Sequence, residues 1–165
     1  MFDGCTSLTT APSLPATKLD DTCYCGMFRN CTSLTSAPEL TVISIGYRSC
    51  HSMFEGCTSL TKAPLVLQNT TASNTCYDSM FSGCTSLTQA PELPATTLAD
   101  YCYYGMFRSC TSLTSAPELP AKTLTVECYE YMFSGCKSLT TPPELPATNL
   151  AKGCYSYMFS HCTSL

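Results

Sequence analysis

A repeat of 26 residues runs through the sequence and limits what the chain can fold into. The dipeptide Met-Phe recurs every 26 residues, except for one interval of 27 between Met53 and Met80. A fixed period of roughly 20 to 50 residues is typical of stacked repeats and propellers. A propeller blade needs about 40 residues or more, and a unit this short cannot form a core of its own. Each unit is therefore predicted to be one coil of a stack.

The repeat divides the chain into six full units and the start of a seventh, which we expect to form one array. The units are residues 1–26, 27–52, 53–79, 80–105, 106–131 and 132–157, with a partial unit at 158–165. Because the repeating phrase is cut at both ends, we expect the chain to be part of a longer protein. A cut stack presents a coil face at each end, which leaves end-to-end self-association open.

Positions that stay constant between units are predicted to face inward. They follow the pattern Phe-x-x-Cys-x-x-Leu, and in a stack each side chain would lie about 4.8 Å from its copy in the next coil if the backbones pair as strands. The predicted core residues are Phe28, Phe54, Phe81, Phe107, Phe133, Cys31, Cys57, Cys84, Cys110, Cys136, Leu34, Leu60, Leu87, Leu113 and Leu139.

Each unit contains two segments with different patterns. The Thr-rich segment at residues 112–117 suits a short strand, which must end or bulge near its proline because proline cannot donate to a ladder. In residues 97–107, Leu98, Cys102 and Met106 lie four residues apart, as on one face of a helix. We therefore predict an α/β stack with one short strand and one short helix in each 26-residue coil.

The 14 cysteines allow three interpretations. Stacked copies would place their Cβ atoms near 4.8 Å, beyond the roughly 3.5–4.5 Å that a disulfide prefers. Bridges between the two cysteine rows, such as Cys102 to Cys110, stay open if the turn folds back. The tight cluster at residues 23–31 matches no common zinc spacing, so no metal or other cofactor is expected. The favoured interpretation is free cysteine used as a small apolar core residue.

Composition and motifs argue against several functional classes. Only 12% of residues are charged and the net charge is −4, which gives no reason to expect nucleic acid as a partner. No apolar run approaches the ~20 residues of a membrane span, so direct membrane insertion is not expected. Catalysis needs a constellation of side chains placed once, whereas this chain repeats its features and lacks the common nucleophile, zinc and phosphate motifs. We do not expect an enzyme.

The phrase MFSGCTSLTQAPELPATTLADYCYYGMF at residues 80–107 resembles the leucine-rich repeats of the BspA type. The resemblance covers essentially the whole chain and rests on the Phe-x-x-Cys-x-x-Leu pattern, which occurs seven times in phase. It implies a right-handed leucine-rich-repeat solenoid in a secreted or surface-exposed protein used in adhesion. Similar repeats in phage tail-fibre-like proteins imply virion association as a second location. The family carries no catalytic motif.

Positions that vary between units are predicted to face water and to carry any binding site. The predicted contacts are Lys62, Gln89, Ser115 and Thr141, together with the row Glu92, Glu118 and Glu144. The glutamate row is also explained as a merely solvated row of charges. A second surface would be formed by tyrosines that recur beside the cysteines, unless these pack as half-buried edges. They are Tyr24, Tyr77, Tyr103, Tyr129 and Tyr155.

Two functions fit these patterns. The first is an extracellular adhesion or receptor-binding module that recognises a protein or glycan through its surface, since stacked repeats offer long regular surfaces. The second is a rigid spacer or fibre segment. The high identity between units favours the spacer, because a binding site usually needs variation among coils. The irregular segment at residues 41–79 favours binding, because it breaks the uniformity at one place.

Overall fold

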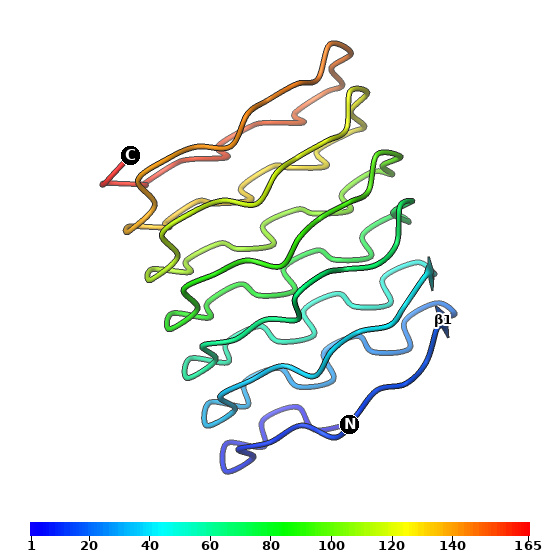
Figure 1. Ribbon diagram of the computed structural model, residues 1–165, viewed down its shortest axis with the longest axis vertical. Coiled ribbons are helices and arrows are strands. Elements are labelled where there is room, and N and C mark those ends of the chain that lie inside the picture. The colour runs from blue at the N-terminus through cyan, green and yellow to red at the C-terminus, as the bar shows by residue number, and fades with distance from the viewer.

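The computed structural model describes all 165 residues as a stack of coils (Figure 1). The N-terminus lies at one end of the stack and the C-terminus at the other, and each unit returns to lie beside the preceding one. Every coil has two long sides. On the extended side, residues 113–124 in one coil, the chain is nearly straight. On the turn side, which comprises residues 100–112 just before that extended segment, the chain follows a series of turns.

Regular strands are short and few. Strand β1 (Lys18–Leu19) pairs in parallel with strand β2 (Ser44–Ile45), and these form the only sheet. Later coils are joined on the extended side by single parallel bridges, such as Gln89 to Ser115 and Ser115 to Thr141. The prolines of the repeated Ala-Pro-Glu-Leu-Pro phrase have no N–H to donate, so a continuous ladder cannot form there.

The predicted helix is wrong, and with it the α/β assignment, because the chain contains no helix. Tyr101, Gly105 and Ser109 have φ angles of 59°, 53° and 60°, in the left-handed region that a right-handed helix excludes. The period of four residues arises from successive four-residue turns instead. These turns still bring Cys102 and Met106 to the core, where both are fully buried.

The backbone hydrogen bonds explain why turns replace the helix. The N–H of Tyr104 donates to the carbonyl of Tyr101, three residues earlier, at 3.2 Å. The N–H of Tyr103 donates instead to the carbonyl of Cys128 in the next coil, at 3.0 Å. This alternation gives a partner to every N–H from residue 101 to residue 110. A two-turn helix would leave its first four N–H groups and last four carbonyls without partners.

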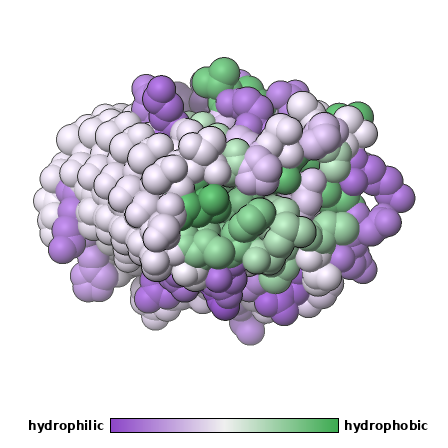
Figure 2. Space-filling view, turned by 90° about the horizontal axis from the view of Figure 1, so that it is seen from below, coloured by the Kyte–Doolittle hydropathy of each residue, from purple (hydrophilic) through white to green (hydrophobic).

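The repeated Phe, Cys and Leu form the centre of the stack. All fifteen predicted core residues are fully buried. Neighbouring phenyl rings lie nearly parallel, with centroids 5.4 to 5.8 Å apart and interplanar angles of 7° or less. Each buried phenyl contributes on the order of 1.5–3 kcal/mol by leaving water. Seen from below, hydrophobic residues gather in the middle of the visible end of the stack, and hydrophilic residues are scattered around its edge (Figure 2).

The cysteine of the repeated motif links each coil to the one before it. The thiol of Cys57 donates to the carbonyl oxygen of Phe28 at 3.1 Å, and that of Cys84 donates to Phe54 at the same distance. Six coils repeat this contact at 3.0 to 3.1 Å. All 14 cysteines are free, so the bridge left open between the two rows is not formed. The thiol therefore serves as a small apolar group with one weak donor.

Raising the pH above 9 should destabilise the stack through its buried thiols. Burial raises the pKa of Cys57, Cys76 and Cys136 from 9.0 to about 12. The unfolded chain therefore releases these protons at lower pH than the folded chain. The stabilisation is fully present below pH 9 and is lost as the pH rises from 9 towards 12. Within that window each such thiol lowers the free energy of unfolding by up to about 1.4 kcal/mol per pH unit.

Urea unfolding at about pH 7, 9 and 10.5, under reducing conditions, measures this effect. The Cys136→Ala variant should show a shallower decline of its unfolding free energy with pH, because one buried thiol is gone. The Cys25→Ala variant loses an exposed thiol and should follow the parent chain. A midpoint that is independent of pH across this range would contradict the interpretation.

Candidate ligand-binding surfaces

The residues predicted to bind a ligand lie on the extended side and are all exposed. Gln89, Ser115 and Thr141 form a row joined by parallel bridges. The glutamates stand three residues further along their coils and form a second row beside the first. Lys62 lies in the preceding coil, bridged to Ser36. The structure therefore brings all seven predicted residues together on one surface: Lys62, Gln89, Ser115, Thr141, Glu92, Glu118 and Glu144.

Shallow pockets open between neighbouring coils along the glutamate row. A pocket of about 570 Å³ is lined by Pro91, Glu92, Pro117 and Glu118, among others. The next, of about 210 Å³, is lined by Pro117, Glu118 and Glu144 and by further prolines. None of these glutamates forms an ion pair within the chain. Each pocket therefore combines rigid apolar proline rings with unpaired carboxylates, a combination suited to a cationic side chain.

The third coil interrupts this regular surface with one inserted residue. Val66 pairs with Glu92, so Leu65 has no counterpart in the next coil and accounts for the extra residue of this unit. Leu65 follows Met53 at the same interval as Glu92 follows Met80, so counting along the unit would place Leu65 in the glutamate row. The pairing shows that Val66 takes that place. The insertion has the character of a bulge, which redirects a side chain away from its regular path. The side chain of Leu65 is 77% exposed.

Hydrogen bonds on both sides hold the bulge in place. The N–H of Leu65 donates to a carboxylate oxygen of Glu39 at 3.1 Å, and its carbonyl accepts the N–H of Glu92 at 2.8 Å. A pocket of about 390 Å³ on one side is lined by Leu65 together with Glu39, Lys62 and Gln89. A second pocket, of about 230 Å³, is lined by Leu65, Gln89 and Glu92. Leu65 thus presents an apolar side chain within a polar surround.

The tyrosines beside the second cysteine row are mostly core residues. Tyr77, Tyr103 and Tyr129 are each 1% exposed and stack with ring centroids 5.6 and 5.8 Å apart. The hydroxyl of Tyr77 donates to the side-chain oxygen of Asn69 at 2.5 Å. In the next coil Ala95 takes the place of Asn69, and the buried hydroxyl of Tyr103 has no partner. Packing, and not ligand binding, therefore explains this row.

Replacing these two tyrosines by phenylalanine should have opposite effects on stability. Tyr103→Phe removes a buried hydroxyl that has no partner, so the free energy of unfolding should stay constant or rise by about 1 kcal/mol. Tyr77→Phe leaves the Asn69 oxygen without a donor and should lower it by about 1–3 kcal/mol. The variants lose the same atom from neighbouring positions of one stack, so each controls for the other. Equal losses in urea unfolding would refute the assignment.

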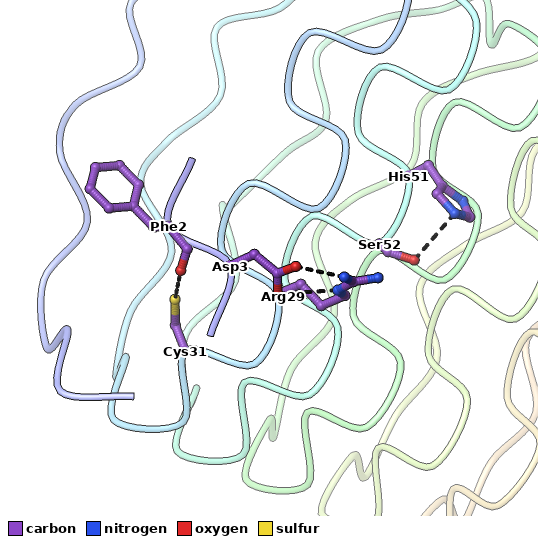
Figure 3. A network of polar contacts seen from close by, with 6 residues as sticks. All are labelled: Phe2, Asp3, Arg29, Cys31, His51 and Ser52. Carbon is purple, nitrogen blue, oxygen red and sulfur yellow. Dashed lines mark hydrogen bonds and ion pairs between the residues drawn. The ribbon is translucent and has the colours of Figure 1, made fainter. Parts of the chain in front are cut away.

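Sequence reasoning missed one polar constellation on the turn side. His51 Nε2 lies 3.5 Å from the hydroxyl of Ser52 (Figure 3), and His51 Nδ1 lies 3.3 Å from Asp78. The contacts run from the serine through the histidine to the aspartate, as in a Ser-His-Asp triad. However, the contact with Asp78 is no hydrogen bond, and Ser52 is only 5% exposed. The group is better explained by stacking, because His51 and Asp78 occupy the same position in successive coils.

The same stacking explains the Asp3–Arg29 pair, whose side chains meet at 2.6 Å across adjacent coils (Figure 3). Aligning the units, and not only the motifs, would have found both contacts in the sequence.

The structure contains no helix of the length and apolarity that a membrane span requires. It also contains no group of three or more His, Cys, Asp or Glu side chains arranged to hold a metal ion.

Comparison with known proteins gives a structural likeness. No family model matches the chain, and no curated protein matches it. The chain is similar to the crystal structure of a leucine-rich cell surface protein from Faecalibacterium prausnitzii A2-165, with 21% sequence identity and a TM-score of 0.47. The likeness covers 79% of this chain and 30% of that chain, so this chain spans less than a third of that protein's length. A likeness this low carries no argument about function.

Proposed function

We propose that the chain is a non-catalytic binding module of a BspA-like, cell-surface or secreted repeat protein, and that it binds a partner protein along its extended side. The exposed, inserted Leu65 carries this proposal. Binding hot spots combine a central residue that becomes fully desolvated with a polar surround that excludes water. Leu65 offers such a centre, with Lys62 and Gln89 in the surround.

The fold itself gives no reason for this leucine. The coils on both sides of the insertion have 26 residues and stack in the same way. An exposed leucine gains nothing in the isolated chain, whereas its burial against a partner contributes on the order of 1.5–3 kcal/mol. The insertion also lies within the irregular segment at residues 41–79, where the sequence departs from uniform repetition. This local asymmetry supports recognition over a purely structural spacer.

The glutamate row supports a partner that lies along the stack and carries basic residues. Unpaired carboxylates of Glu92, Glu118 and Glu144 recur once in each of three successive coils, with proline-lined pockets between them. Complementary charge of this kind guides orientation and raises the association rate. The chain's low charge content leaves few competing surfaces for such a partner. The spacer function has the uniformity of the remaining coils in its favour.

Deleting Leu65 separates these two functions. The deletion restores the 26-residue spacing of the neighbouring coils, so the thermal midpoint should change by no more than a few degrees, about 1 kcal/mol in unfolding free energy. Binding to immobilised fibronectin, fibrinogen, laminin, collagen and mucin is measured with the intact chain. At least one of these should bind, and the deletion should weaken that binding at least about tenfold, as expected for one lost apolar contact.

Ile43→Thr is the matched control. Ile43 is an aliphatic residue of the same irregular segment with 68% exposure, but it lines none of the pockets described above. Its replacement should leave binding unchanged. If the deletion variant binds as well as the parent chain, Leu65 has no role in recognition. If the parent chain binds none of these proteins, the spacer function is favoured.

A further inference from the structure

The turn side carries a cluster of tyrosines that the fold does not require. Three positions in each coil change their chemistry along the stack. In the third coil they hold Thr75, Asp78 and Ser79. In later coils the equivalent positions hold Tyr101, Tyr104, Tyr131 and Tyr157. Because the third coil stacks with small or charged residues at these positions, packing does not explain the aromatic rings.

The four rings form a continuous chain of contacts across three coils. The ring centroids of Tyr101 and Tyr104 are 6.3 Å apart. Tyr104 meets Tyr131 edge to face at 5.8 Å, and Tyr131 stacks on Tyr157 at 5.0 Å with an angle of 8°. Such arrangements match the preferred geometries of aromatic pairs. The rings therefore hold one another in fixed orientations on the surface.

The cluster is accessible and its polar atoms are free. Tyr101 is 36% exposed and Tyr157 is 63% exposed, whereas Tyr104 and Tyr131 are half-buried. None of the four hydroxyls forms a hydrogen bond within the chain, in contrast to the buried hydroxyl of Tyr77, which is bound to Asn69. Tyr157 belongs to the last complete coil, and the three inner rings are Tyr101, Tyr104 and Tyr131. They present apolar surface and unsatisfied hydroxyls at one place.

Charged groups surround these rings. The guanidinium carbon of Arg108 lies 5.5 Å from the ring centroid of Tyr131, a cation–π contact that orients the side chain. Burial raises the pKa of Tyr104, and the nearby charges of Glu130 and Asp78 raise it further, while Arg108 opposes them. Asp78 and Glu130 occupy the position of Tyr104 in the preceding and the following coil, so a guanidinium and two carboxylates stand beside the tyrosine cluster. No exposed large aliphatic side chain lies among these residues.

We propose that Tyr101, Tyr104 and Tyr131, with Arg108 and Glu130, form a carbohydrate-binding site that takes a sugar unit of a neutral glycan. One face of a pyranose carries C–H groups with partial positive charge, which are attracted to the negative face of an aromatic ring. Its hydroxyl groups accept from a guanidinium and donate to a carboxylate, which gives charge-assisted hydrogen bonds. The cluster supplies both kinds of group side by side.

A neutral glycan fits this surface better than an anionic ligand does. A protein is the alternative occupant, because tyrosine and arginine are also frequent in protein interfaces, and it would leave every oligosaccharide probe unbound in the test below. An anionic ligand meets the carboxylates of Asp78 and Glu130 and a chain of net charge −4, which disfavour its approach. The site lies on the turn side, whereas Leu65 lies on the extended side. It is therefore a second site that does not depend on the proposed protein binding.

The test uses the full chain and defined oligosaccharides as probes. Cellohexaose, xylohexaose, mannohexaose, chitohexaose and neutral mucin-type oligosaccharides are titrated by isothermal calorimetry. Tyrosine emission gives a second readout, because the chain contains no tryptophan. At least one probe should bind and change the tyrosine emission. The triple variant Tyr101→Thr, Tyr104→Ser, Tyr131→Ser takes its residues from equivalent positions in other coils, and should lower that affinity at least about tenfold.

Two further variants make the result specific. Tyr129→Phe alters a buried tyrosine of the same stack and should leave glycan affinity unchanged. Deletion of Leu65 should also leave it unchanged, which separates this site from the extended side. If the triple variant does not fold, the single change Tyr101→Thr at the most exposed of the inner rings replaces it and should weaken binding. The proposal is overturned if no probe binds the parent chain, or if binding survives in the folded tyrosine variant.

Discussion

The hydrogen bonds between successive coils are the constraint on which the rest of the structure depends. On the turn side, alternate N–H groups donate within the coil and to the next coil. A single coil would leave half of these donors without a partner, and an unpaired buried donor costs about 1–3 kcal/mol. The coil is therefore stable only in a stack, where stability accumulates from contacts between nearest neighbours. The left-handed residues at every fourth position are the conformational cost of aiming alternate donors at the next coil.

This backbone arrangement places each side chain against its copy in the next coil. Identical residues then form uniform rows, as in the phenyl stack and in the thiols that donate to the preceding coil. Where the copies differ, the row becomes a pair with its own chemistry, as for Asp3 with Arg29 and for His51 with Asp78. The surface of this chain is therefore determined by which residues succeed one another at a given position of the repeat, more than by local sequence.

The period and the inward positions could be predicted because stacking demands the same core residue in every coil. Phe107 and its copies have no freedom to vary. The turns could not be predicted in the same way, because Tyr101 and Ser109 adopt left-handed angles that neither residue type indicates, and a four-residue turn repeats apolar residues much as a helix does. Counting residues would misplace Leu65, because the sequence does not show which residue of an unequal unit is the insertion. Only its neighbour's pairing with Glu92 shows it.

The two candidate binding surfaces share one property, which is that the fold does not require them. A coil stacks without the inserted leucine, and the first three coils stack without tyrosine at the positions equivalent to Tyr101, Tyr104 and Tyr131. Because the core imposes the same demands on each coil, departures that serve no packing purpose are where selection for recognition can act. Only 12% of the residues are charged. Long-range attraction is then limited to the orientation that the glutamate row provides. The binding energy must come from short-range contacts, and an exposed leucine and a fixed cluster of tyrosines are the groups that supply them.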